Sequence, residues 1–225
     1  MRNIWTVVVV VALAVIVSAA YNSFFARPSG PQLSVSPLDS VAAHAADAVS
    51  NPEIQPEDRV LGQDGARVTI VEYSSLTCPH CAQFHAEGYR HLKSAYIDTG
   101  KVRLVFRDFP LDGLALRAAA LAECVPAERY FPFLQLLFES QKGWARSDNP
   151  VAELVRLGQL AGLSDQRAVG CIQDEAGLEK IIQERLTGQE DYQIDSTPSF
   201  IIDGRKHPGA LTAEELDDIL APLLG

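Results

Sequence analysis

Two cysteines separated by two residues, in the segment Cys78-Pro79-His80-Cys81, constrain this sequence more than any other feature. They follow residues 67–73, whose apolar alternation predicts a β-strand, and they precede apolar residues at helical spacing. The pair is therefore expected at the start of a helix that follows a strand. Such an arrangement supports thiol–disulfide exchange, because one sulfur can attack a disulfide while the other resolves the mixed disulfide.

The surroundings of the motif favour a thiolate at Cys78. Free amides and the dipole at a helix N-terminus stabilise a negative sulfur. Pro79 suits the first helical position, where an amide hydrogen would be unpaired, and His80 adds a donor or a positive charge. We expect the pKa of Cys78 to fall from the free value of about 8.5 into the range of roughly 3.5 to 7.5. Cys81, one turn into the helix, is expected to be the shielded resolving cysteine.

The N-terminal residues 1–26 predict export from the cytoplasm. Arg2 precedes an uncharged apolar run at 4–17, which has the length of a signal-peptide core and is followed by small residues. The uncharged stretch continues to Phe25, which is long enough to span a bilayer if it is not cleaved. A signal peptide and a membrane anchor therefore both remain open, and either places the rest of the chain outside the cytoplasm.

The remaining chain divides into a linker and one α/β domain. Prolines with Ser, Gly and Gln around them predict a linker at 27–57, so that the domain covers 58–225. The pattern gives a strand, a helix ending near Gly100, a second strand at 101–106, an inserted helical subdomain at about 112–188, a hairpin at 199–207 and a last helix. That last helix opens with a Thr-x-x-Glu capping box at Thr212 and Glu215. Within the insertion, helices are expected at 114–124, 129–141, 151–160 and, as a pair, 165–186.

Charge and cysteine usage narrow the class of protein further. The net charge of -10 argues against a nucleic-acid partner, which needs clustered Lys and Arg. Cys124 and Cys171 fall on predicted helices of the insertion. In an oxidising compartment they are expected to form a structural disulfide that stabilises the fold by about 3 to 4 kcal/mol. The alternative is two separately buried thiols.

From about residue 58 to the C-terminus, the sequence resembles the thioredoxin-fold DsbA family of thiol–disulfide oxidoreductases. The resemblance rests on the motif at 78–81, Glu72 six positions before it, Thr197-Pro198 ahead of a strand, and the stretch Phe-Arg-Asp-Phe-Pro-Leu at 106–111. It implies a thioredoxin-like fold with an inserted helical subdomain.

The resemblance also implies roles for the residues around the motif. Pro198 should follow a cis peptide bond and face the cysteines, while Thr197 offers its backbone to an extended substrate segment. Glu72, which the strand alternation places on the same face as Val68 and Ile70, should be a buried carboxyl with a raised pKa that exchanges a proton with Cys81.

The activity implied by the resemblance is oxidation of thiols in unfolded exported proteins. A membrane reoxidant of the DsbB type is the expected partner, the periplasm the expected location, and neither an organic cofactor nor a metal is required. Thr197 stands where the best-known oxidases of the family carry Val, and Thr also occurs there in the isomerase branch. The direction of exchange, as oxidase, isomerase or reductase, therefore stays open.

Two further interpretations compete with this one. Cys78, His80, Cys81 and His85 could be metal ligands, although no second ligand pair follows at matching spacing. If they are not, His85 is expected on the helix surface or at the rim of the site. The other alternative is a chaperone or binding module on the same scaffold, against which the intact cysteine pair argues.

Overall fold

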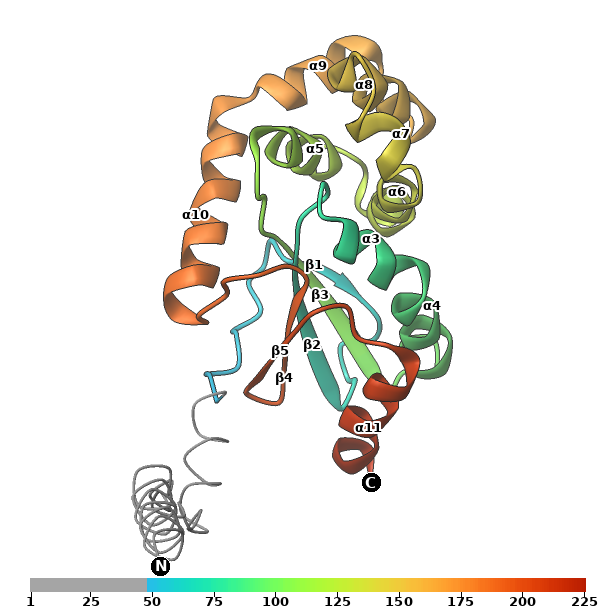
Figure 1. Cartoon of the computed structure of the whole chain (residues 1–225), viewed down its shortest axis with the longest axis vertical. Coiled ribbons are helices and arrows are strands. Elements are labelled where there is room, and N and C mark those ends of the chain that lie inside the picture. Colours follow the sequence, from blue (N-terminus) through green and yellow to red (C-terminus); the bar gives the residue numbers. More distant parts are fainter. Residues whose placement is uncertain (1–47) are drawn as a thin grey trace, which may run out of the picture. The chain divides into compact units, whose positions relative to one another are not determined.

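The computed structural model describes residues 48–225, which form one α/β domain (Figure 1). The predicted signal peptide or anchor at 1–26, and residues 27–47 of the predicted linker, lie outside the described residues. Among residues 48–225, no helix combines the length and apolar character needed to cross a membrane.

A five-stranded sheet with the order β1-β3-β2-β4-β5 forms the centre of the domain. Only β2 and β3 run parallel, and the other neighbours are antiparallel. The predicted strands are all present, whereas β1 was not predicted, because three residues are too few to show an alternation. The strands are β1 (Arg59–Leu61), β2 (Val68–Ser74), β3 (Val102–Asp108), β4 (Ser199–Ile202) and β5 (Arg205–Pro208).

The crossover between β2 and β3 begins with the Cys-x-x-Cys motif and consists of three helical segments instead of the single predicted helix. They are α3 (Pro79–Ala86), α4 (Gly88–Leu92) and a π-helical turn, η1 (Lys93–Ile97). The break falls at Glu87, where the backbone leaves helical geometry. Gly88 packs so closely against the carbonyl of Leu211 that no side chain would fit there. The break in the helix therefore coincides with a close contact to a distant loop.

The insertion after β3 contains six helices, the last ending slightly beyond the predicted boundary of 188. The disulfide joins Cys124, at the end of α5, to Cys171 in α9, with a sulfur–sulfur distance of 2.04 Å. Of the six, the short α7 was not predicted. The helices are α5 (Gly113–Glu123), α6 (Ala127–Glu139), α7 (Gln141–Ala145), α8 (Pro150–Leu160), α9 (Asp165–Gln173) and α10 (Glu175–Asp191).

The last helix, α11 (Ala213–Leu224), opens with the predicted capping box. The hydroxyl of Thr212 accepts from the backbone amide of Glu215, and the Glu215 side chain accepts from the amide of Thr212. The box satisfies two amides that would otherwise lack partners at the helix start. Leu216 and Leu220 bury the inner face of this helix against the main core.

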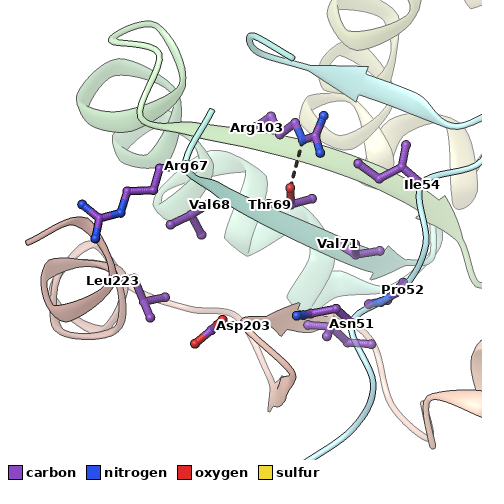
Figure 2. A pocket seen from close by; sticks show the side chains of 11 residues that line it. Asn51, Pro52, Ile54, Arg67, Val68, Thr69, Val71, Arg103, Asp203 and Leu223 are labelled. Atoms are coloured by element: carbon purple, nitrogen blue, oxygen red, sulfur yellow. Dashed lines mark hydrogen bonds between the residues drawn. The ribbon is translucent and has the colours of Figure 1, made fainter. Parts of the chain in front are cut away.

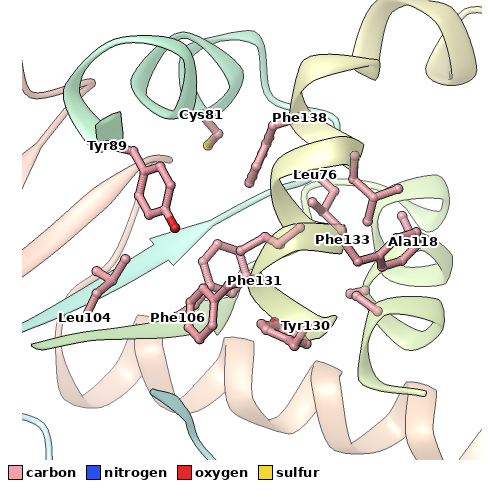
Figure 3. Packing of buried hydrophobic residues seen from close by; sticks show 14 of the residues in the cluster. Leu76, Cys81, Tyr89, Leu104, Phe106, Ala118, Tyr130, Phe131, Phe133 and Phe138 are labelled. Atoms are coloured by element: carbon pink, nitrogen blue, oxygen red, sulfur yellow. The ribbon is translucent and has the colours of Figure 1, made fainter. Parts of the chain in front are cut away.

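The main core lies between one face of the sheet and the helices α3, α5, α6 and α11. Figure 3 shows part of this core, with residues of α3, α5 and α6 among those labelled. A second, smaller cluster on the opposite face contains Tyr73 and Phe109, and Gly188 of α10 packs against the Tyr73 ring. Ile54 packs on this second face too, although it belongs to the predicted linker. The predicted domain boundary at 57 therefore differs from the structure, in which residues of the preceding segment already contribute to the domain.

A buried ion pair fixes that segment to the sheet. Arg107 of β3 lies 2.9 Å from the carboxylate of Asp58 and donates to the carbonyl of Glu53 at 2.7 Å. It also donates to the hydroxyl of Tyr73. Since the side chains of Arg107 and Asp58 are almost fully buried, each requires the other as its partner.

Candidate active site

Cys78 caps the N-terminus of α3, and the residue is only 6% exposed. In the dithiol form described here, its sulfur donates to the carbonyl of Thr197 at 3.3 Å. A hydrogen bond from Cys81 lowers the pKa of Cys78 to about 5, helped by the backbone amides of Cys81 and His80 and opposed by burial. The local structure therefore favours a thiolate at Cys78 at neutral pH.

Cys81 lies one turn further along α3 and has the opposite character. Its side chain is fully buried, and the backbone amide of Ser75 donates to its sulfur at 3.5 Å. Burial, and then the neighbouring Cys78 sulfur, raises the pKa of Cys81. The two sulfurs are therefore unequal: Cys78 carries the negative charge and Cys81 keeps its proton.

The segment before β4 faces the cysteines as the resemblance implied. The peptide bond between Thr197 and Pro198 is cis, and both residues are buried. The carbonyl of Thr197 points at the Cys78 sulfur, and the carbonyl of Pro198 accepts from Gly209. The fold thus brings Thr197 into contact with the sulfur of Cys78, although the two residues are 119 positions apart in the sequence.

His80 contributes to the site through its backbone. Its amide lies beside the Cys78 sulfur and lowers the pKa of that thiol, while the imidazole is exposed to solvent. The His80 side chain was predicted to lower the pKa of Cys78, but the described residues show no contact between the imidazole and the Cys78 sulfur. A ring at this exposed position remains free to meet a bound partner.

The helical insertion holds the active-site turn through a residue that the sequence did not single out. Gln141 of α7 is 5% exposed and donates from Nε2 to the carbonyls of Leu76 and Cys78, both at 2.9 Å. Thr77 donates in turn to Asp112, the N-cap of α5, at 2.7 Å. A lone glutamine in a helical block carries no sequence signal, so only the tertiary structure identifies its role.

Glu72 lies on β2 and is fully buried on the face that packs against α3, as the strand alternation predicted. Its Oε1 is 3.0 Å from Nε2 of His85, and its Oε2 is buried without a hydrogen-bond partner among the described residues. The contacts of the Cys81 sulfur are instead with Cys78, Ser74 and Ser75. The structure therefore pairs Glu72 directly with His85.

The expectation that His85 lies on the helix surface or at the rim is wrong. The side chain is 1% exposed, because position 85 is one helical turn after the buried Cys81 and shares its inward face. Its Nδ1 lies 3.3 Å from Oε1 of Gln135. With both ring nitrogens directed at protein oxygens, His85 is not arranged as a metal ligand beside Cys81. Within residues 48–225, no group of three or more His, Cys, Asp or Glu side chains is arranged to bind a metal ion.

Two hollows differ in their relation to the cysteines. One, of about 410 Å³, adjoins the motif and is lined by Pro79, Gln141, Lys142 and Arg146. The other, of about 550 Å³, lies over the sheet with Arg67 and Arg103 among its lining residues, and neither cysteine lines it (Figure 2). Neither cysteine lines the first hollow either, but Pro79, which directly follows Cys78, does.

A thioredoxin-like sheet that presents a Cys-x-x-Cys pair at a helix start, opposite a cis-proline, defines a dithiol protein of the thioredoxin superfamily. The family model described as Thioredoxin matches residues 55–221. The crystal structure of alpha-DsbA1 from Wolbachia pipientis is 32% identical, with a TM-score of 0.72 over 76% of this chain and 93% of that one. The chain belongs to the DsbA-like family of thioredoxin-fold proteins.

Other relatives agree with this assignment. A Rickettsia felis protein named as a protein-disulfide oxidoreductase is 32% identical over 176 residues, which cover 74% of this chain and 63% of the relative. A protein-disulfide isomerase from Novosphingobium aromaticivorans is 25% identical, with a TM-score of 0.66 over 76% of this chain and all of that one. The chain thus spans less than two thirds of the Rickettsia relative, but nearly the whole of the matched crystal structures.

Proposed function

We propose that this chain is a protein thiol–disulfide oxidoreductase that introduces disulfides into exported proteins. The observation that carries the proposal is the lowered pKa of Cys78, about 5, at a sulfur opposite a cis-proline. A stabilised thiolate favours the reduced form of the pair, so the Cys78–Cys81 disulfide is oxidising. Isomerase or reductase activity on the same fold is the alternative direction.

The exchange follows from the inequality of the two sulfurs. A substrate thiolate attacks the Cys78 sulfur of the disulfide, and Cys81 leaves and takes up a proton. A second substrate thiolate then attacks the substrate sulfur of the mixed disulfide, and Cys78 leaves as a thiolate. The substrate loses two electrons and two protons, of which Cys81 retains one proton and solvent receives the other. We assign Glu72 the exchange of the proton with Cys81, supported by its complete burial beneath α3.

The substrate is proposed to lie in extended form along the segment before β4. Thr197 offers backbone groups there, and Pro198 follows the cis bond. The hollow beside Pro79 gives room for side chains, and Lys142 and Arg146 make part of its wall basic. His80, between the two cysteines, is exposed, so a bound polypeptide could contact its ring.

The proposed setting is an oxidising compartment outside the cytoplasm, the periplasm in a bacterium with two membranes. The apolar residues 1–26 support export, by a cleaved signal or a retained anchor. The disulfide between Cys124 and Cys171 fits the same compartment. Catalytic turnover requires an electron acceptor for the Cys78–Cys81 dithiol, and family membership favours a membrane reoxidant of the DsbB type.

Measuring the redox equilibrium of the Cys78–Cys81 pair against glutathione tests the proposal. We expect a reduction potential nearer to about -120 mV than to about -270 mV, the values typical of a strong oxidant and of thioredoxin. A potential near the thioredoxin value would overturn the oxidase direction and favour a reductase. Oxidation of a peptide dithiol that survives Cys78→Ser would refute the enzymatic assignment itself.

A further inference from the structure

Both nitrogens of the buried His85 ring face side-chain oxygens. Nε2 lies 3.0 Å from Oε1 of Glu72, and Nδ1 lies 3.3 Å from Oε1 of Gln135. A neutral imidazole has one donor and one acceptor nitrogen, whereas both nitrogens of an imidazolium donate. The protonation of the ring therefore depends on which of these oxygens can only accept.

The orientation of the Gln135 side-chain amide shows whether Nδ1 of His85 carries a hydrogen. Its Nε2 donates to the backbone carbonyl of His85 at 3.2 Å and to the carboxylate of Glu139 at 3.1 Å. Because both partners are acceptors, the network assigns the NH₂ group to that side and leaves the amide oxygen facing the ring. An amide oxygen can only accept, so Nδ1 of His85 carries a hydrogen.

A single proton then lies between Nε2 of His85 and Oε1 of Glu72. It gives either an imidazolium with a carboxylate or a neutral ring with a carboxylic acid, and the pair is neutral overall in both forms. The ring lies between the aromatic faces of Tyr89, at 4.8 Å and 26°, and Phe138, at 4.1 Å and 21°. Figure 3 shows these two rings on either side of the space below Cys81. The two stacked rings hold the imidazole in place, so the contact between its Nε2 and Oε1 of Glu72 is fixed in position.

We propose that His85, oriented by Gln135, is a positioning residue that binds Oε1 of Glu72 and so prepares the carboxylate to accept the proton of Cys81. The available oxygen is Oε2 of Glu72, which is buried and unpartnered among the described residues. This inference rests on the proposed function, and it adds His85 and Gln135 as the residues that prepare Glu72 for proton exchange with Cys81.

The step in which this matters is the resolution of a mixed disulfide at Cys78. Cys81 gives its proton to Oε2 of Glu72, and its sulfur attacks the Cys78 sulfur. The bond between Cys78 and the partner sulfur breaks, and the partner leaves as a thiolate. The cysteine pair is oxidised to the disulfide, and the partner is reduced.

Other ionisable groups facing the pair come from three helices. Cys81 lies one turn earlier on α3. Tyr89 comes from α4, and burial, with the charge of Glu72 as a smaller cause, raises the pKa of its phenol. Glu139 of α6 reaches the ring only through Gln135 and pairs with Arg90 at the surface. A pH profile attributed to the pair of His85 and Glu72 therefore has to be distinguished from the titration of these neighbouring groups.

The two steps can be separated by reacting the reduced full-length chain with 5,5′-dithiobis(2-nitrobenzoate). Attack by Cys78 releases a first thionitrobenzoate anion, and attack by Cys81 on the mixed disulfide releases a second. Stopped-flow absorbance from pH 6 to pH 9 would be recorded for the natural chain and for His85→Phe, which keeps a flat ring between the aromatic faces. His91→Phe is the matched control, since His91 pairs with Asp217 at the surface of α4.

For His85→Phe, we expect an unchanged first phase and a second phase slowed by about tenfold to a hundredfold at pH 7. Without the His85 ring, Oε1 of the buried Glu72 loses its hydrogen-bond partner, so the pH profile of the second phase should also change. His91→Phe should leave both phases unchanged. In a Glu72→Gln background, adding His85→Phe should cause no further slowing, because both changes remove the same proton acceptor.

The outcomes distinguish the inference from the proposed function. An unchanged second phase and pH profile in His85→Phe, beside normal release by the natural chain, would overturn the role of His85 alone. Additive slowing in the double variant would show that His85 acts independently of Glu72 and would also overturn it. If His85→Phe fails to fold, Gln135→Leu provides the same test, with a smaller slowing expected and no slowing refuting the inference. A natural chain that releases no thionitrobenzoate would instead refute the proposed function.

Discussion

The lowered pKa of Cys78 predicts that acid destabilises the reduced protein more than the oxidised one. The pKa falls from 9.0 to about 5 on folding, and each pKa unit corresponds to about 1.36 kcal/mol. The thiolate therefore stabilises the fold fully above pH 9, loses that effect as the pH falls and contributes nothing well below pH 5. Between pH 7 and pH 5 the reduced protein should lose about 2 kcal/mol of its free energy of unfolding. This value is set low because solvent screens part of the interaction. The disulfide form has no thiolate to titrate.

Urea unfolding of the reduced and the oxidised chain at pH 7 and pH 5 would measure this difference. The reduced form should lose about 2 kcal/mol relative to the oxidised form over this interval. Cys78→Ser, which cannot form the disulfide, should lack this loss of stability between pH 7 and pH 5, because serine does not titrate there. A parallel decrease in the two redox forms would refute the reasoning, since it would place the titrating group outside the cysteine pair.

Three other predictions concern groups away from the cysteine pair. Replacing both Cys124 and Cys171 with Ala should lower the free energy of unfolding by about 4 kcal/mol in the chain-entropy model, while the first thionitrobenzoate release stays unchanged. Arg107→Leu should cost about 3 to 5 kcal/mol in urea unfolding, because it leaves the buried carboxylate of Asp58 unpaired; a loss below one kcal/mol would mean that Asp58 reaches water. Burial raises the pKa of Glu184 to about 7, so its ionisation costs stability as the pH rises toward that value. Glu184→Gln should therefore raise stability by about 1 to 2 kcal/mol at pH 8, after allowance for partial exposure, and have little effect at pH 4.

Local patterns predicted the parts of the domain that depend on nearby residues. The capping box at Thr212 and Glu215 opens α11 as expected, because both partners lie within one helical turn. The alternation of β2 placed Glu72 on the buried face. The cis bond before Pro198 came from the resemblance, since no local pattern distinguishes it from a trans bond.

Features that depend on distant contacts could not be predicted in this way. The break before Gly88 arises where Leu211 approaches the helix, and the sequence around position 88 gives no sign of that neighbour. His85 was expected on the helix surface or at the rim of the site, although its spacing of four residues from Cys81 places both on the same, inward face. Gln141 bonds to the active-site turn only because the insertion folds back over that turn.

The two hydrogen bonds from Gln141 also limit how far this protein can be reduced in size. A shortened version without the insertion would have a smaller sheet-and-helix scaffold that still contained both cysteines. It would also leave the carbonyls of Leu76 and Cys78 without their donor, next to the sulfur whose reactivity depends on its exact setting. The inserted helices therefore contribute directly to the structure of the active-site turn, and we expect a shortened version to lose that support.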